Sequence, residues 1–225
     1  MDGILSLDKP AGITSLDAVT RVKHALGVPK AGHAGTLDPA ATGVLLVCLG
    51  RATKLFDRLQ LHDKEYHATV TLGVETDTYD AAGRVVARGP VPRLGAAGLE
   101  AALGPFRGEI RQVPPMYSAL KHRGRPLYER ARAGETVERA PRTVTVRELE
   151  LLGFVPPDLT LRIVCTRGTY VRSLAHDLGR ALGCGAHLTA LRRTRSGPYR
   201  DRVALTLAAV EADPEAARAR VEAVP

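Results

Sequence analysis

The sequence predicts a mixed fold class, in which helices and strands enclose a core large enough for one large domain or two small ones. The chain has 225 residues, of which 44% are hydrophobic. Alternating or continuous apolar runs indicate strands, and apolar residues at helical spacing indicate helices between them. Predicted strands are 4–7, 44–49, 64–73, 142–154 and 159–165, and predicted helices are 15–26, 51–61, 99–103, 174–182 and 205–224.

The boundaries of these elements follow from local chemistry. Ser15, or Thr14 with Asp17 three residues later, can cap the first helix, and Gly27 ends it. In the strand 64–73, Tyr66 shares the apolar face with Ala68, Val70 and Leu72. The polar segment 75–84 lacks the spacing of a calcium loop, so it is predicted to be a hairpin turn.

Composition limits the classes of partner. Lys and Arg exceed Asp and Glu by 32 to 24, which gives a net charge of +8 and favours an anionic partner such as nucleic acid. Trp is absent, so base stacking would fall to Tyr, His or Arg. Cys48, Cys165 and Cys184 have no paired spacing, which argues against a disulfide framework or a zinc site. The chain lacks a long apolar segment and a basic leader, so we expect a cytoplasmic protein without membrane contact.

The glycine-rich segment 32–43 carries one acid, Asp38, directly before a buried apolar run. One interpretation is structural, because Asp38 followed by Pro39 can cap a short helical turn. The other is chemical, because glycines allow close approach to a ligand and His33 lies on the same loop. A single acid on such a loop can serve as a nucleophile or base.

This segment resembles the catalytic motif of the TruB family of tRNA pseudouridine synthases, G-H-x-G-x-L-D-P-x-A-x-G-x-L, in which the Asp is the nucleophile. The resemblance implies that Asp38 is catalytic. His33 on the same loop is a candidate substrate contact, which would fill the space that a flipped-out base leaves or hydrogen-bond the RNA. The resemblance also extends to the segment K-x-Y-x-A-x-x-x-L-G, which implies that Tyr66 lies against the target base and takes part in proton transfer. From the alternation alone, a core tyrosine with a satisfied hydroxyl is the favoured interpretation of Tyr66.

Two later segments resemble further motifs of the family. C-x-x-G-T-Y-x-R-x-L implies that Arg172 pairs with Asp38 and that Tyr170 packs in the pocket, although an arginine here can also pair with a surface acid. G-A-H-x-x-x-L-R-R-x-x-x-G implies that Leu191 contacts the base. Without the resemblance, the residues 184–197 form an amphipathic segment with a basic face.

The run 113–134 is rich in Lys, Arg and His, carries two tyrosines and has few apolar side chains. It is either a mobile loop or a segment that contacts RNA. It resembles the family's P-P-x-Y-S-A-x-K-x-x-G-x-x-x-Y insertion, which implies an RNA-clasping insertion at 113–140. The candidate RNA contacts here and in the other motifs are Lys9, Tyr117, Lys121, Arg123, Arg125, Tyr128, Arg192 and Arg193. Basic residues that merely face solvent are the alternative.

The resemblance implies an α+β pseudouridine synthase fold, with a large mixed, mainly antiparallel sheet flanked by helices and a central active-site cleft. One catalytic domain would span 1–225, and 200–225 would be a helical tail without a full C-terminal RNA-binding domain. The implied activity is isomerisation of uridine 55 in the TΨC loop of tRNA, on a flipped-out base and without cofactor or metal. We expect a monomer that acts on the T-arm without a protein partner.

Two rival functions share this scaffold. The first is a catalytically silent RNA-binding or RNA-folding module, which the presence of Asp38, Tyr66 and Arg172 argues against. The second is a guide-RNA-dependent pseudouridine synthase of the archaeal and eukaryotic type. The short tail and the basic insertion argue against this second rival.

Overall fold

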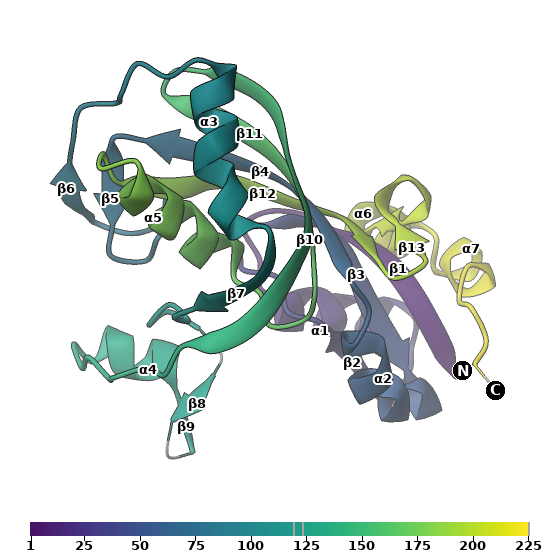
Figure 1. Cartoon of the computed structure of the whole chain (residues 1–225). Coiled ribbons are helices and arrows are strands. Elements are labelled where there is room, and N and C mark those ends of the chain that lie inside the picture. The colour runs from purple at the N-terminus through teal and green to yellow at the C-terminus, as the bar shows by residue number, and fades with distance from the viewer. Residues whose placement is uncertain (119, 123, 225) are drawn as a thin grey trace. The chain divides into compact units, whose positions relative to one another are not determined.

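The computed structural model describes residues 1–118, 120–122 and 124–224 (Figure 1). The backbone forms two compact units, one made of residues 1–67 and 190–225 and the other of residues 68–189. Strands β4 (Lys64–Leu72) and β12 (Ala186–Ser196) each begin in one unit and end in the other.

The first unit is built on strands of mixed direction. β1 (Gly3–Lys9) runs antiparallel to β3 (Thr42–Leu49) and parallel to β14 (Leu205–Thr206), and β3 runs parallel to β12. The short strands β2 (Ala31–Ala34) and β13 (Tyr199–Arg200) pair with β3 and β12. Every side chain from Val44 to Leu49 is buried, which confirms the predicted buried strand.

Helix α1 (Ser15–Ala25) begins with the predicted capping chemistry. The Thr14 hydroxyl accepts from the Asp17 backbone N–H, and the Asp17 carboxylate accepts from the Thr14 N–H, so two donors of the first turn are satisfied. Val19 and Val22 are buried on one face, and α1 packs against α6 (Leu207–Ala212).

The remaining helices of this unit are shorter than the sequence predicts. The expected helix 51–61 is divided into the 3₁₀ helix η1 (Gly50–Leu55) and α2 (Phe56–Gln60), and the predicted tail 200–225 begins with η3 (Asp201–Val203). The tail forms α6 and α7 (Pro214–Ala219) instead of one helix. Pro214 has no N–H to continue α6, and the Asp213 side chain caps the new helix at the Ala216 N–H.

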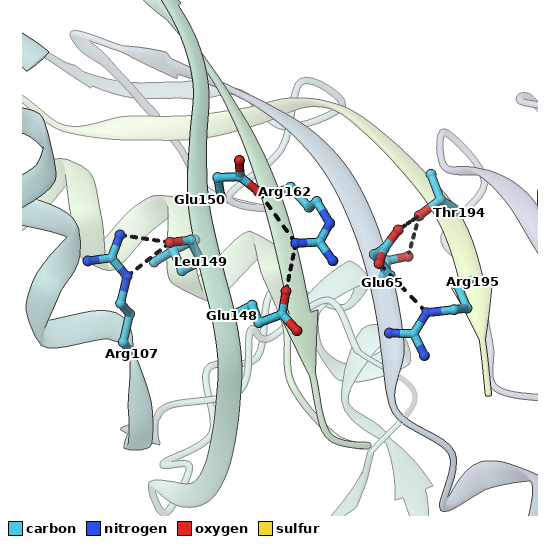
Figure 2. Close-up of polar contacts among 8 residues, drawn as sticks. All are labelled: Glu65, Arg107, Glu148, Leu149, Glu150, Arg162, Thr194 and Arg195. Atoms are coloured by element: carbon cyan, nitrogen blue, oxygen red, sulfur yellow. Dashed lines mark hydrogen bonds and ion pairs between the residues drawn. The ribbon is translucent and has the colours of Figure 1, made fainter. Parts of the chain in front are cut away.

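The second unit contains the strand order β4, β11 (Asp158–Cys165), β10 (Arg142–Val155) and β7 (Gly108–Gln112). The β10–β11 and β10–β7 pairs are antiparallel. Side chains reinforce this pairing, because Arg162 on β11 lies 2.7 Å from Glu148 and 3.4 Å from Glu150 on β10 (Figure 2). Arg107 donates to the Leu149 carbonyl on the same strand (Figure 2).

Helices and hairpins complete the second unit. Helix α3 (Ala96–Leu103) contacts α5 (Val171–Ala181) and β10, and η2 (Gly104–Phe106) follows α3. The predicted hairpin forms between β5 (Val74–Thr76) and β6 (Val85–Arg88). The segment 113–140 contains β8 (Lys121–His122), β9 (Arg125–Pro126) and α4 (Leu127–Arg132). These helices and mainly antiparallel strands confirm the predicted α+β class.

Candidate active site

Asp38 lies in the loop that joins β2 to β3. Gly35 and Gly43 bracket this loop with φ values of 85° and 98°, a backbone region that residues with a Cβ rarely adopt. The Ala41 N–H donates to the Asp38 carbonyl at 3.0 Å and closes a turn with Pro39 at its second position. Asp38 therefore begins a tight turn, and it is half-buried.

Side chains from distant segments hold the backbone of this loop. The Ser15 hydroxyl accepts from the Leu37 N–H and donates to the Leu37 carbonyl, both at 2.9 Å. This one side chain therefore makes the two backbone hydrogen bonds that a neighbouring strand would otherwise make. The Pro39 carbonyl accepts from the Gly12 N–H at 2.8 Å. Ser15 is buried, so water does not compete for these bonds.

Lys9 is fully buried beside the same loop. Its ammonium donates to the carbonyls of Pro10, Ile13 and Pro39 at 2.7–3.2 Å. Burial lowers the pKa of Lys9 from 10.5 to about 8, the negative charge of Asp38 opposes this shift, and Arg193 adds to it. Lys9 thus binds carbonyls of its own chain, and its contact with RNA stays a prediction.

The two arginines of the L-R-R motif have different surroundings. Arg192 is partly exposed and pairs with Asp8 at 3.0 Å and Asp201 at 2.9 Å. Arg193 is buried, and its guanidinium donates to backbone carbonyls before and after Asp38. The predicted RNA contacts of both arginines remain untested.

His33 is a half-buried residue of β2. Burial, with the positive charge of Arg193, lowers the pKa of the His33 imidazole below 6.5, so the ring is neutral at pH 7. Among the described residues, its Nδ1 is buried without a hydrogen-bond partner. A neutral ring with an unused polar atom can accept from or donate to a substrate group.

Tyr66 and Leu191 belong to the same unit as Asp38. Tyr66 lies on the buried face of β4 with 9% of its surface exposed, and Leu191 is half-buried on β12. The Thr194 hydroxyl donates to the Glu65 carboxylate at 2.9 Å, and Arg195 lies 3.6 Å from that carboxylate (Figure 2). These contacts hold the residue before Tyr66 against β12.

Arg172 is buried in the first turn of α5, in the second unit. Its Nε lies 3.6 Å from an Asp80 oxygen, and its other nitrogens donate to the Thr78 and Tyr117 carbonyls at 3.3 and 2.9 Å. The sequence reasoning did not single out Asp80. Asp80 lies in the polar segment 75–84, which the sequence predicted only as a hairpin turn.

The Arg172 partners lie on a turn with an unusual backbone. Tyr79, between Thr78 and Asp80, has a φ of 65°, and its ring stacks on the His176 imidazole with centroids 3.8 Å apart. Tyr170 precedes α5, where its N–H donates to the buried Gln112 side chain and its carbonyl accepts from it.

The predicted site residues thus fall into two groups. Asp38, His33, Tyr66, Leu191 and Lys9 belong to the first unit, and Arg172, Tyr170 and Tyr117 belong to the second. The structure brings Arg172 together with Tyr117 through the Tyr117 carbonyl. The pairing of Arg172 with Asp38 joins residues of different units and stays a prediction.

The candidate RNA contacts of the insertion are mostly exposed. Lys121 and Tyr128 are exposed, and the Tyr128 ring lies 5.6 Å from the Arg132 guanidinium. Arg125 pairs with Glu129 and Glu135 at 3.3 and 3.5 Å. Arg123 lies outside the described residues.

The described residues contain neither a cluster of metal ligands nor a helix that could cross a membrane. No group of three or more His, Cys, Asp or Glu side chains in residues 1–118, 120–122 and 124–224 could hold a metal ion. Within the same residues, every helix is too short or too polar to cross a membrane.

Comparison with known proteins identifies the family. The model of the TruB family pseudouridylate synthase N-terminal domain matches residues 23–171, and that of the tRNA pseudouridylate synthase B C-terminal domain matches residues 172–223. The chain is 56% identical to tRNA pseudouridine synthase B of Aromatoleum aromaticum, over 97% of the chain and 70% of that protein. It is 52% identical to tRNA pseudouridine synthase B of Bordetella pertussis, over 97% of the chain and 91% of that protein.

Solved structures agree with this result. The chain is 36% identical to a chain of a Cbf5-Nop10-Gar1 complex, with a TM-score of 0.71 over 92% of this chain and 52% of that one. The chain therefore spans about half the length of this solved relative. Together, the matched models and the curated relatives show that the chain belongs to the TruB family of pseudouridylate synthases.

Proposed function

We propose that the chain isomerises uridine 55 in the TΨC loop of tRNA to pseudouridine, with Asp38 as the nucleophile. Membership of the TruB family and the names of the curated relatives support a tRNA substrate. The observation that carries the proposal is the Asp38 loop. Its backbone is held by buried partners, while the one carboxylate at its turn is half-buried.

The reaction is an isomerisation, so its atoms balance within one nucleotide. The N1–C1′ bond of uridine breaks, the uracil turns, and a C5–C1′ bond forms. The proton on C5 leaves to solvent, and N1 gains a proton. No electron donor, acceptor or metal is required for this balance.

Asp38 would act in its ionised form near C1′ or C6 of the nucleotide. Its loop fixes the backbone from which the carboxylate extends, which lowers the cost of reaching a reactive geometry. The Lys9 ammonium attracts the Asp38 carboxylate from the buried side of the loop. Through the family resemblance, Arg172 is the proposed partner of Asp38, Tyr66 the proton-transfer partner, and His33, Tyr170 and Leu191 the contacts of the flipped base.

The insertion 113–140 is the proposed contact with the T-arm. Lys121 and Tyr128 expose a cation and an aromatic face, which suit phosphate and base contacts. We further propose that a monomer acts in the cytoplasm without a protein partner or cofactor.

The test is tritium release from an unmodified tRNA transcript labelled at C5 of uridine, with purified protein alone and EDTA present. We expect release of one tritium per tRNA, and none from a transcript with cytidine at position 55. Asp38→Asn should bind the same tRNA and release none. If the folded wild-type protein releases no tritium, the proposal that the chain is an enzyme is wrong. If tritium is released from the cytidine-55 transcript, the assignment of position 55 is wrong.

A silent RNA-binding module is the second outcome of this assay. It predicts that wild-type protein and Asp38→Asn bind tRNA equally and that neither releases tritium. A guide-dependent enzyme predicts release only after addition of a guide RNA.

A further inference from the structure

Arg193 is a long, charged side chain at the interior of the first unit, with only 1% of its surface exposed. A buried guanidinium is costly unless its donors are satisfied. Its Nε donates to the Val44 carbonyl at 2.6 Å, its Nη2 to the Gly35 carbonyl at 2.9 Å, and its Nη1 to the Thr36 carbonyl at 3.4 Å. Gly35 and Thr36 belong to the glycine-rich segment 32–43, which carries Asp38, and Val44 directly follows it.

These acceptors lie on both sides of Asp38. Gly35 and Thr36 precede it, and Val44 follows it at the second residue after Thr42, where β3 begins. A guanidinium is planar and presents its donors in a fixed fork. One rigid group therefore sets the distance between the two ends of the loop.

The strand register explains why Arg193 reaches this place. Gly43 pairs with Arg193 on one side and with Lys9 on the other. A Cβ at Gly43 would lie 2.2 Å from the Arg193 carbonyl oxygen, so only glycine allows this approach. Two cations thus flank the first residues of β3.

The donors around the loop form a complete set from Gly35 to Pro39. Arg193 satisfies the carbonyls of Gly35 and Thr36, and the Ser15 hydroxyl satisfies that of Leu37. The carbonyls of Asp38 and Pro39 accept from the Ala41 N–H and from Lys9, respectively. Every carbonyl from Gly35 to Pro39 therefore has a donor within the protein.

We propose that Arg193 is a positioning residue, which fixes the loop of Asp38 through the Gly35, Thr36 and Val44 carbonyls and makes no contact with RNA phosphate. An arginine that binds phosphate must present its donors to solvent before RNA arrives. The donors of Arg193 instead point to carbonyls inside the protein. The proposal rests on the proposed function only in taking Asp38 as the reacting group.

The test compares Arg193→Lys and Arg193→Gln with the wild type, and uses Arg200→Gln as the matched control. Arg200 is an exposed arginine of β13 in the same unit, outside the proposed site. Lys keeps the charge of Arg193 but loses the fork, and Gln loses both. Circular dichroism and thermal unfolding establish that each variant folds.

Three quantities are measured on each protein. They are the single-turnover rate at saturating tRNA, the dissociation constant for tRNA as a function of salt, and hydrogen exchange of the peptide 34–45 without RNA. We expect both Arg193 variants to lose about 100-fold in rate, as misplacement of a reacting group by about 1 Å can cause. The dissociation constant should stay within about threefold of the wild type, with an unchanged salt slope.

Hydrogen exchange tests the positioning role of Arg193 independently of any activity on tRNA. The Leu37 and Ala41 amides should exchange faster in both Arg193 variants, whether or not the protein acts on tRNA. Faster exchange with an inactive wild type would support the positioning role and defeat the proposed activity.

Other results would overturn the positioning role. Weaker tRNA binding with a salt slope reduced by about one, at an unchanged saturated rate, would assign Arg193 to phosphate contact. Unchanged rate and exchange in Arg193→Lys and Arg193→Gln would show that the fork is dispensable. If Arg193→Gln does not fold, Arg193→Lys alone decides between these outcomes.

Discussion

Arg172 on α5 and Asp80 on the turn after β5 form an ion pair, with the arginine Nε 3.6 Å from the carboxylate oxygen. The side chain of Arg172 is 5% exposed and that of Asp80 is 20% exposed. Water screens such a pair weakly, so the attraction between the two charges is largely retained. The pair joins the helix that carries a predicted catalytic arginine to the loop that carries Asp80.

Asp80→Asn should therefore destabilise the protein and lower its activity. The change keeps the size of the side chain but removes the Asp80 charge from beside the buried Arg172, which we expect to cost about 1–3 kcal/mol. Urea unfolding measures the stability, and single-turnover tritium release measures the activity. Asp77→Asn is the control, because Asp77 pairs with the exposed Arg84 and such pairs contribute about 0–1 kcal/mol. Equal losses in both variants would contradict the special role of Asp80.

Tyr79→Ala should destabilise the turn that carries Thr78 and Asp80. The Tyr79 ring stacks on His176, and an aromatic pair contributes about 0.5–1.5 kcal/mol beyond its buried area. Tyr79→Phe keeps the ring and should match the wild type in melting temperature and rate. Tyr79→Ala should lower both, since Thr78 and Asp80 on either side contact Arg172. An equal effect of Ala and Phe would exclude the stack as the cause.

Acid should destabilise the protein partly through His33. Burial and Arg193 place the pKa of folded His33 below 6.5, so the unfolded chain takes up this proton first as the pH falls. Stability linked to His33 is therefore complete above about pH 6.5 and is lost as the pH falls through the folded-state pKa. Urea unfolding at pH 7.5 and pH 5.5 should show a smaller difference in His33→Asn than in the wild type. An equal difference in His33→Asn and in the wild type would contradict this role of His33.

Gly43→Ala should destabilise the first unit strongly. Gly43 has a φ of 98°, and its new Cβ would meet the Arg193 carbonyl oxygen at 2.2 Å. The backbone conformation alone costs about 1–2 kcal/mol for a residue with a Cβ, and the clash adds to it. Gly108→Ala separates the two effects, because Gly108 has a φ of 79° with nothing within 4 Å of the new Cβ. Thermal unfolding should therefore show a larger loss at 43 than at 108, and similar losses would contradict the close approach.

Local sequence patterns predicted the parts of the fold that depend on interactions between residues close in the sequence. The alternation of 64–73 gave the buried face of β4, and the Thr14–Asp17 pair gave the start of α1. The secondary structure of residues 184–197 was harder to predict, because their basic composition indicated an amphipathic segment and not specifically a strand. β12 is a strand because both of its neighbours, β3 and β4, offer backbone partners from far away in the sequence.

The sequence predicted the motif of the candidate site but not the long-range contacts around it. The Asp38 motif and its order in the chain identified the family, which the comparisons confirmed. Composition could not reveal that Lys9 and Arg193 are buried, because such residues are almost always exposed. Their position depends on the register of β1 and β12 against β3, which is a long-range property. The contact of Asp80 with Arg172 is likewise formed by residues more than ninety positions apart.

The hydroxyl of Ser15, which takes the place of a strand beside Leu37, has a consequence for protein engineering. A peptide copied from 32–45 would contain every residue of the glycine-rich motif but neither Ser15, Lys9 nor Arg193. Such a peptide, grafted between two strands of another scaffold, would keep its sequence but not its backbone conformation. The portable unit is the loop together with the three side chains that surround it.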